Sequence, residues 1–391
     1  MAQVKPPFET FARIKVIGVG GAGGNALARM ISSRIQGVEF VAANSDFQDL
    51  HKSGAPTKLQ IGKNLSRGLG AGMNPEIGRQ AASDAKEEIL EALKGADMVF
   101  ITAGMGGGTG TGASPVIAEI ARDVGALTVA IVTKPFAFEG AQRTRLAEEG
   151  WNLLRDKVDS IITIPNDRLL SIIDRKTPIM EAFAIVDDVL RQGVQGISDL
   201  ITIPGIINVD FADVKAVMAN SGSALMGIGR GSGEDRAIEA AKMAINSPLL
   251  EVAIDGARGV LFNVSGGTDL GMAEINEAAK IITENIDPNA KVIFGAVEDD
   301  KLKKGEIKIT VIATGFNNSH SGTIKPSLAT PSSIFNDFTP APTKKIEKPP
   351  ESHMGGGGGN GQEQRKEFVD SALNDSEMFD IPAFIRKKMK E

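Results

Sequence analysis

Cysteine is absent from the 391-residue chain, which excludes disulfides, thiolate catalysis and cysteine-ligated metal centres. The three histidines, His51, His320 and His353, are too few and too scattered for a histidine-based metal site, so we predict no metal site built from side chains. Tyrosine is also absent and tryptophan occurs once, so an aromatic platform that stacks on nucleic-acid bases is not expected. No apolar run approaches the ~18 residues of a membrane-spanning helix.

The charge balance and the first residues add two exclusions. The 43 basic and 49 acidic side chains give a formal net charge of -6, so nothing draws the chain as a whole toward nucleic acid or an anionic membrane. The first ten residues include Lys5 and Glu9 and lack the apolar core of a signal peptide. We therefore expect a soluble, cytoplasmic protein with no nucleic-acid partner and no direct insertion into a membrane.

The first half of the chain alternates β-rich runs with helical stretches. Strands are expected at 13–17, 38–43, 58–61, 97–103, 126–132 and 160–164, and helices at 25–33, 75–93, 115–124 and 142–154. Apolar strands that alternate with amphipathic helices are typical of a parallel sheet covered on both faces. This pattern predicts a doubly wound, Rossmann-like α/β domain over residues 13–177, after an N-terminal extension of residues 1–12.

Beyond this domain the pattern changes. A long central helix is expected over 178–202, with Pro178 in its first turn and an apolar stripe along one face. A smaller α+β domain is predicted over 203–316, with helices near 214–220, 235–246 and 272–284 and strands near 259–264, 292–296 and 306–313. Residues 317–369 are rich in Pro, Ser, Thr, Lys and Gly, and we predict a disordered linker because such a segment buries too little apolar surface.

The last segment, 370–391, carries an isolated apolar cluster. Ile381, Phe384 and Ile385 would share one face of a short helix that has Pro382 in its first turn. Such a cluster after a polar linker is typical of a peptide that folds in a partner's groove. A tail without function is the alternative, and the basic run 386–390 could instead touch anionic lipid.

Two glycine-rich segments each follow an expected strand and precede an expected helix. Gly18–Asn25 satisfies G-x-G-x-x-G, whose backbone N–H groups can hold phosphate at a helix N-terminus. Because Asp46 follows the second strand, where a ribose-binding acid would lie, an NAD-dependent oxidoreductase fits too, and a tight structural turn is a third reading. Gly104–Gly112 has six glycines and two threonines, and we expect a second phosphate cradle with hydroxyl donors. The lysine-bearing Walker loop, G-x-x-x-x-G-K-[ST], does not occur.

Two i,i+4 pairs stand out elsewhere. The simplest interpretation of Glu139 and Arg143 is a solvent-exposed ion pair on the surface of a helix. Phe183 and Asp187 share one face of the central helix, where a ring could stack on a purine and a carboxylate could accept two hydrogen bonds from guanine. Phe183 could equally be a core residue, and Asp188 leaves the register open by one residue.

The hexapeptide Asn208–Asp213 lies between the central helix and the next one. Asp210 is well placed as an N-cap and Asp213 suits the positive end of a helix dipole, so capping is the simple reading. Capping is compatible with catalysis, because a capped helix start holds its carboxylates rigidly.

The run Gly106-Gly107-Gly108-Thr109-Gly110-Thr111-Gly112 resembles the GGGTG[ST]G signature of the tubulin and FtsZ superfamily, and the likeness extends over about residues 12–316 and to the C-terminal end. By this resemblance, Ala71 and Gly72 would lie at the γ-phosphate, Glu139 and Arg143 at the ribose and phosphates, and Asn166, Phe183 and Asp187 at the base. The GTP phosphates would be held by Gly20, Gly21, Ala22, Gly23, Gly24, Asn25, Gly107, Gly108, Thr109 and Gly110, with Asn25 also reaching the base. Asn208, Asp210 and Asp213 would form a catalytic loop that completes the site of the adjacent subunit.

The resemblance implies a GTPase, activated by self-assembly, that polymerises head to tail into the filaments of the bacterial division ring. It would use GTP and GDP, with Mg²⁺ bound mainly through the phosphates. Residues 380–391 would recruit membrane anchors and division regulators of the FtsA, ZipA or SepF kind, which would place the protein at midcell under the inner membrane. An NAD-dependent oxidoreductase and a nucleotide-regulated scaffold without hydrolysis stay open as alternatives; a eukaryotic tubulin is disfavoured because its long acidic tail is missing.

Overall fold

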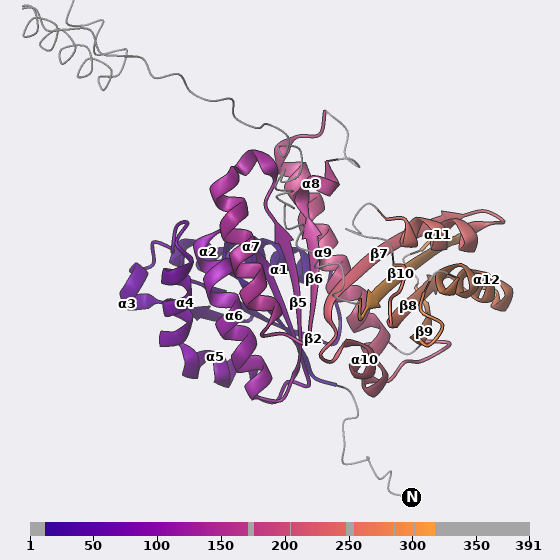
Figure 1. Ribbon diagram of the computed structural model, residues 1–391, viewed down its shortest axis with the longest axis horizontal. Coiled ribbons are helices and arrows are strands. Elements are labelled where there is room, and N and C mark those ends of the chain that lie inside the picture. Colours follow the sequence, from indigo (N-terminus) through magenta and orange to yellow (C-terminus); the bar gives the residue numbers. More distant parts are fainter. Residues whose placement is uncertain are drawn as a thin grey trace, which may run out of the picture. The chain divides into compact units, whose positions relative to one another are not determined.

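The computed structural model describes residues 12–170, 176–203, 205–247, 254–284, 286–299 and 302–316 (Figure 1). The predicted linker 317–369 and the predicted C-terminal peptide 370–391 lie outside these residues, as do residues 1–11. The strands are β1 Ile14–Val19, β2 Val38–Asn44, β3 Thr57–Gln60, β4 Met98–Gly104, β5 Leu127–Lys134, β6 Ser160–Pro165, β7 Gly222–Ser232, β8 Gly259–Gly266, β9 Lys291–Glu298 and β10 Glu306–Thr314. The helices are α1 Gly20–Ser32, α2 Phe47–Lys52, α3 Lys63–Ser66, α4 Pro75–Asp84, α5 Lys86–Leu93, α6 Gly108–Asp123, the 3₁₀ turn η1 Ala137–Glu139, α7 Ala141–Arg155, α8 Asn166–Leu169, α9 Ile179–Thr202, α10 Phe211–Met218, α11 Arg236–Ile245 and α12 Met272–Thr283.

The strands form one sheet in the order β3-β2-β1-β4-β5-β6-β7-β10-β8-β9. The first six are all parallel, and their order 3-2-1-4-5-6 is that of a doubly wound nucleotide-binding fold, which confirms the predicted fold class. The direction of winding reverses between β1 and β4. In such sheets ligands bind beyond the carboxyl ends of the strands at this reversal, and these ends carry both glycine-rich segments.

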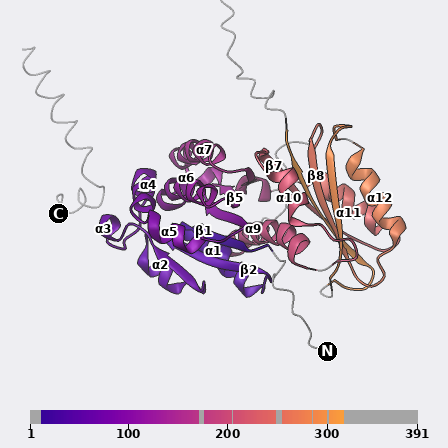
Figure 2. The ribbon, with the colours of Figure 1, turned by 90° about the horizontal axis from the view of Figure 1, so that it is seen from below.

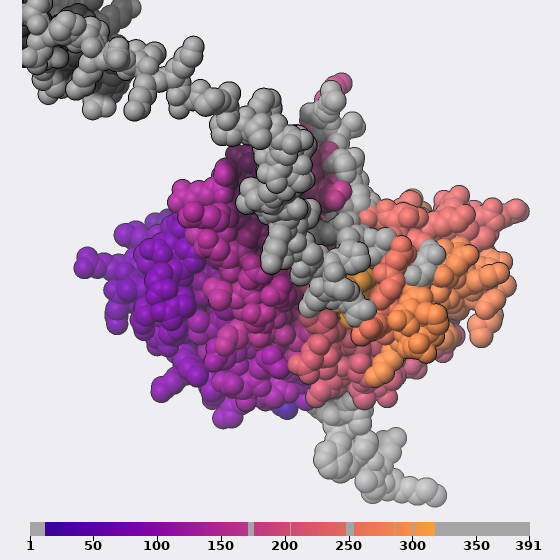
Figure 3. Space-filling model, viewed as in Figure 1, coloured from indigo at the N-terminus to yellow at the C-terminus, as the bar shows by residue number. Residues whose placement is uncertain are grey.

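Alternate residues of each central strand belong to two different hydrophobic cores, one on each face of the sheet. On β1, Val16 belongs to a core shared with α1, α9 and α10, whereas Ile17 belongs to a core shared with α4, α5, α6 and α7. Side chains of a strand point to opposite faces in turn, so both faces are covered and the strands are apolar throughout. Figure 2 shows α6 and α7 on one side of the strands, and in Figure 3 the helices α4–α7 form the indigo-to-magenta surface over that face.

The strand β7, which joins the parallel strands to the rest of the sheet, was not predicted. It pairs in parallel with β6 over three residues and antiparallel with β10 along nine. Glycine has a low strand propensity, so this glycine-rich segment was not recognised as a strand. Gly227, Gly229 and Gly231 lie on one face of β7, where a Cβ would come within 1.9–2.0 Å of carbonyl oxygens of α11. Glycine is therefore used to let a helix pack directly on the strand backbone.

Two helices begin earlier than the sequence pattern suggested. The model starts α1 at Gly20 rather than near residue 25, and α6 at Gly108 rather than near Pro115. Intrinsic propensity disfavours glycine in a helix, but here contacts with neighbouring backbone override it. The stretch expected as one helix over 75–93 is broken at Ala85 into α4 and α5, and Pro178 is the N-cap of α9 rather than a residue of its first turn.

Among the described residues, no helix is both long and apolar enough to cross a bilayer.

Candidate functional site

The two glycine-rich segments meet at the carboxyl ends of β1 and β4. Gly20 has a φ of +70°, and a Cβ on it would lie 3.1 Å from the backbone nitrogen of Gly110 and 3.3 Å from Cβ of Thr109. Both segments lie in the first turns of their helices, so the backbone N–H groups of Gly20, Gly21 and Ala22 in α1, and of Gly107, Thr109 and Gly110 at the start of α6, have no intrahelical acceptor and lie on adjoining helix N-termini. Such termini attract anions through these donors and through the helix dipole.

A third loop closes against them. The N–H of Gly108 donates to the carbonyl of Gly72 at 2.7 Å, and a Cβ on Gly108 would lie 2.8 Å from Cβ of Ala71. A Cβ on Gly107 or on Gly72 would meet nothing within 4 Å, so both face open space. The structure thus brings Ala71, Gly72 and the second glycine segment to one place, with room beside them for a ligand.

Each of the two threonine hydroxyls has a partner within the chain. Oγ1 of Thr109 shares a 2.6 Å hydrogen bond with Oγ of Ser45, and Oγ1 of Thr111 accepts the N–H of Gly106 at 2.8 Å. Both bonds are buried and tie the second glycine segment to its surroundings.

A cavity of about 460 Å³ opens beside α1 and the start of α9. Asn25, Phe183 and Asp187 line it together with Arg29 and Met180. Phe183 is 38% exposed and forms a T-shaped pair with Phe136, with ring centroids 5.6 Å apart. The cavity thus offers a planar ligand an exposed phenyl ring for stacking and the Asp187 carboxylate as a hydrogen-bond acceptor.

Asp187 and Asp188 differ in their hydrogen-bond partners and therefore in the direction of their pKa shifts. Burial raises the pKa of Asp187 to about 6, against the opposing effect of Arg29, whose Nε lies 3.6 Å from Oδ2. Burial acts on Asp188 too, but hydrogen bonds from Arg191 at 2.6 Å and Gln192 at 2.5 Å outweigh it and lower the pKa of this carboxyl. Asp188 is therefore already satisfied, and Asp187 is the carboxylate that a ligand can engage.

Three further predicted residues lie around the same end of the sheet. Asn166 follows β6 directly, is 5% exposed, and its Oδ1 is buried without a hydrogen-bond partner. Glu139 Oε2 lies 3.1 Å from Nη1 of Arg143. Arg143 also packs against Gly106, because a Cβ on that glycine would lie only 2.8 Å from Cγ of the arginine. An orphaned buried acceptor and an arginine against the second glycine segment both fit a bound nucleotide.

The predicted catalytic residues are elsewhere. Asp210 is the N-cap of α10 and accepts the N–H of Asp213 at 2.8 Å, while Asn208 accepts the N–H of Gly205 at 2.7 Å. All three side chains are exposed. They follow the C-terminal end of α9, whereas Phe183 and Asp187 lie in its first turns; Figure 1 shows α10 and α8 at opposite ends of the sheet. The structure does not bring these residues to the cavity beside α1 and α9 of the same chain.

The sequence analysis did not identify two residues that lie at the site. Arg29 lies one helical turn after Asn25 and contacts Asp187; its i,i+4 spacing from Asn25 could have identified it. Asp49 lies beside the first glycine segment, with Oδ2 within 3.5 Å of a Cβ on Gly21, and no sequence signal pointed to it because α2 was not expected. Asp46, the ribose candidate of a dehydrogenase, accepts the N–H groups of Gln48 and Asp49 as the N-cap of α2.

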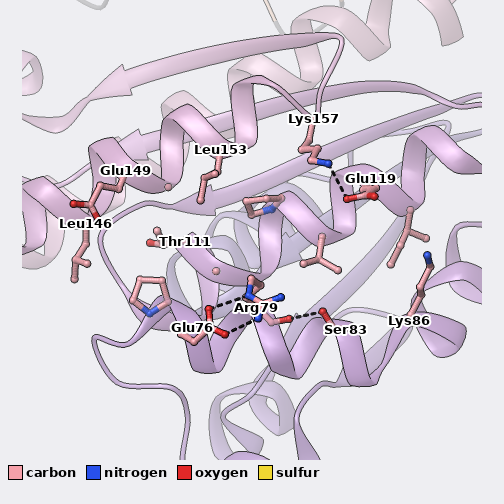
Figure 4. Close-up of a pocket in the computed structure, with 16 residues that line it drawn as sticks. Glu76, Arg79, Ser83, Lys86, Thr111, Glu119, Leu146, Glu149, Leu153 and Lys157 are labelled. Carbon is pink, nitrogen blue, oxygen red and sulfur yellow. Dashed lines mark hydrogen bonds and ion pairs between the residues drawn. The ribbon is translucent and has the colours of Figure 1, made fainter.

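A second cavity of about 450 Å³ lies between α4, α6 and α7 (Figure 4). Glu76 pairs with Arg79 and Lys157 pairs with Glu119 along its rim. Thr111 and Gly112 of the second glycine segment line it, and the other residues predicted for the site do not. In the part of the chain that the structure describes, no cluster of three acidic or histidine side chains could hold a metal ion.

Comparison with known proteins agrees with this geometry. The model of the Tubulin/FtsZ family GTPase domain matches residues 13–174, and that of the FtsZ family C-terminal domain matches residues 222–317. Among solved structures, an empty FtsZ dimer from M. jannaschii is similar at 48% identity and a TM-score of 0.76, over 78% of this chain and 89% of that one. A mutant of M. jannaschii FtsZ gives 48% identity and a TM-score of 0.75, over 78% and 92%. CetZ2 from Haloferax volcanii, as a GTPγS-bound protofilament, is 22% identical with a TM-score of 0.66, over 77% and 92%, a likeness of fold alone.

Proposed function

Because the chain belongs to the tubulin/FtsZ family of GTPases, we propose that it binds GTP in the cavity beside α9 and hydrolyses it only when a second subunit completes the site. The observation that carries this proposal is the joining of Asn25, Phe183 and Asp187 in one cavity beside two adjoining helix N-termini. Guanine presents two adjacent donors that a single carboxylate accepts, and adenine does not. This chemistry favours a GTPase over the oxidoreductase considered above.

The length of α9 argues that the catalytic residues act on another subunit. Asp187 and Thr202 are fifteen positions apart, which corresponds to about 22 Å of helix at 1.5 Å per residue, and Asp210 lies beyond that end. A carboxylate there cannot touch the nucleotide of its own chain. If it acts in hydrolysis, it does so on the nucleotide of a neighbour whose cavity meets this end.

Exposed apolar side chains occur at both ends, as such a contact requires. Leu69, which is 83% exposed, Phe138 and Met180 surround the nucleotide end. Ile206, which is 62% exposed, and Phe294 lie at the other end, where the N–H of Ile206 donates to Ala296 on β9. Two different patches that meet head to tail generate an open filament rather than a closed dimer. Among the similar structures, an FtsZ dimer and a CetZ2 protofilament support this arrangement.

Each group then has a defined task. Gly21 to Asn25 and Gly108 to Gly110 surround the phosphates, with the free backbone N–H groups of the two helix N-termini as donors, and Asp187 selects guanine. Oδ1 of Asp210 is fixed by the N–H of Asp213, which leaves Oδ2 to orient the attacking water. Phosphoryl transfer depends mainly on such positioning and on charge stabilisation. Mg²⁺, bound mainly through the phosphate oxygens, would neutralise the charge that develops on them.

Mixing two defective variants tests whether the site is shared. Asp210→Ala should bind GTP normally and lose turnover by on the order of 10²-fold, whereas Asp187→Ala should not bind GTP. In an equimolar mixture, about a quarter of head-to-tail contacts join an intact cavity to an intact loop, so phosphate release should reappear. Asp210→Asn, which retains a capping side chain, separates the loss of charge from the loss of the cap; Asp235→Ala, an exposed acid at the start of α11, is the matched control.

Two results would contradict the proposal. Full turnover in Asp210→Ala would remove this carboxylate from the mechanism and revive the scaffold that assembles without hydrolysis. Loss of turnover that mixing does not restore would place the whole site within one subunit. Light scattering after addition of GTP, GDP or ATP reports assembly in the same samples.

We further propose that the filaments form the division ring at midcell in the cytoplasm of a bacterium. The predicted peptide 380–391 would recruit membrane anchors and regulators of the FtsA, ZipA or SepF kind; it lies outside the described residues, so its sequence alone supports this role. Deleting residues 380–391 should leave GTP-driven light scattering unchanged and abolish anchor binding. A deletion that stopped assembly of the purified protein would make the peptide part of the filament contact instead.

A further inference from the structure

A polar cavity of about 430 Å³ lies between α9 and the paired strands β7 and β10. Three cationic side chains from three elements line it: Arg191 of α9, Arg230 of β7 and Lys308 of β10. Nothing in the proposed GTPase mechanism uses them. The side chains of Arg191 and Lys308 are only 15% and 17% exposed, whereas Arg230 is an exposed residue, so two of the three cations are drawn in from solvent beside the third.

Two of these cations lie opposite each other on adjacent strands of the sheet. Arg230 and Lys308 are register partners in the antiparallel pair of β7 and β10, and both line the cavity. Like charges directly opposite on neighbouring strands repel and destabilise the pair. A counter-charge between them would convert this repulsion into attraction.

The acids of the cavity compensate for the cations only in part. Arg191 is bound to Asp188 at 2.6 Å and to the side chain of Gln195. Nζ of Lys308 lies 3.8 Å from Oδ2 of Asp299, too far for a hydrogen bond. Among the described residues, none forms a hydrogen bond or an ion pair with Arg230. The lining thus holds three cations against two carboxylates, one of which is fully used by Arg191 and Gln192.

Lys308 is in the least favourable position of the three. Its side chain is 17% exposed, so its ammonium group has lost most of its hydration. Burial lowers the pKa of Lys308, and Arg230 and Arg191 lower it further, against the opposing effect of Asp299 and Asp199. Its Nζ also makes no hydrogen bond to a described residue, so up to three donors are available to a ligand.

We propose that this cavity binds a multivalent oxyanion, a phosphate or a polycarboxylate. The guanidinium fork of Arg230 matches the paired oxygens of either group, and Lys308 supplies a point charge from the opposite strand. Gln192 and Thr310 in the lining offer neutral donors for the remaining oxygens. The cavity shares Asp188 and Ser33 with the nucleotide cavity, but it faces the other strands and takes a different ligand.

Isothermal titration calorimetry on the full-length protein tests this site. The chain is saturated with GDP without Mg²⁺, so that the phosphate cradle is occupied, and sodium phosphate or citrate is titrated at constant ionic strength. We expect one anion per chain in the wild type, and binding at least about tenfold weaker in the double variant Arg230→Gln/Lys308→Gln. The control Lys242→Gln/Lys280→Gln removes two exposed charges from α11 and α12 and should bind as the wild type does.

A charge reversal provides an independent measurement. In Arg230→Glu the new carboxylate faces Lys308 and takes the place of the anion, so the melting temperature without anion should rise and the shift on adding phosphate should disappear. Binding of phosphate alone or citrate alone supports the site and identifies its ligand. Equal affinity in wild type and Arg230→Gln/Lys308→Gln, or no binding to the wild type, would overturn the proposal.

Discussion

Guanine recognition by a carboxylate that is half protonated near pH 6 predicts a pH-dependent affinity. Burial raises the pKa of Asp187 from 3.8 to about 6. Only the ionised carboxylate accepts both donors of guanine, so the apparent dissociation constant equals the intrinsic constant divided by the ionised fraction. That fraction is about nine-tenths at pH 7 and about one-tenth at pH 5. Affinity for GDP should therefore fall about tenfold between these values and stay level above pH 7.

Equilibrium binding of a fluorescent GDP analogue to unassembled protein from pH 5 to pH 8 measures this dependence. The terminal phosphate of the ligand titrates near pH ~6 as well, so variants are needed to isolate the protein's share. Asp187→Asn should bind more weakly and lose the tenfold dependence that belongs to the protein. Asp188→Asn should keep it, because Arg191 and Gln192 lower the pKa of Asp188 and leave it ionised throughout. Identical pH profiles in wild type and Asp187→Asn would refute the reasoning.

The sign of the same shift predicts the stability of the nucleotide-free protein. A folded-state pKa above the unfolded value means that the native state binds the proton more tightly, so this group's ionisation costs stability as the pH rises from about 4 to above 6. The cost approaches about 3 kcal/mol at neutral pH, at 1.36 kcal/mol per unit of pKa. Asp187→Asn should therefore raise the melting temperature at pH 7 while it weakens nucleotide binding, and the gain should vanish near pH 4.

Two further substitutions test the packing that positions the site. Gly231→Ala should cost about 2–3 kcal/mol or more of unfolding free energy, since its Cβ would lie 2.0 Å from a carbonyl oxygen of α11; Gly54→Ala, where nothing lies within 4 Å, should be nearly neutral by urea denaturation. Arg236→Ala should cost about 3–5 kcal/mol because it strands the Glu274 carboxylate that the buried guanidinium holds at 2.6 Å. Thermal melts that match those of Lys242→Ala, which removes an exposed charge from the same helix, would show that this ion pair contributes little.

Much of the fold followed from the sequence because its strongest signals are periodic. The apolar strands of the first half and the stripe along α9 predict a doubly wound sheet and a central helix, and the structure has both. β7 was missed because its identity as a strand depends on α11, which lies flat on glycines that no strand propensity rewards. The early starts of α1 and α6 were missed for the same reason: backbone contacts distant in sequence fix the conformation of their glycines.

The glycine-rich parts of the candidate site could be predicted, because a sequence motif marks their backbone conformation. The ionisable residues were harder to predict, because their burial and side-chain partners determine their chemistry. Gly20 to Asn25 and Gly107 to Gly110 were found as turns between a strand and a helix, whereas the buried hydrogen bonds of Thr109 and Thr111 within the chain were not predicted. The distinction between Asp187 and Asp188 needed the side-chain partners of both. The i,i+4 spacing of Arg29 from Asn25 places both on one face of α1, but the contact of Arg29 with Asp187 depends on the packing of α1 against α9, which is distant in sequence.

The glycines at the start of α6 bear on how loss-of-function alleles of this chain should be scored. At Gly108, Gly110 and Gly112, a methyl group would fall 2.6, 2.5 and 1.8 Å from a backbone oxygen of a neighbouring segment. Alleles that replace any of the three would lower the amount of folded protein in the cell before they altered a single phosphate contact. A genetic screen would nonetheless class them as nucleotide-binding mutants. Gly107, whose missing side chain would face open space, is the position in this run where a substitution reports on the ligand.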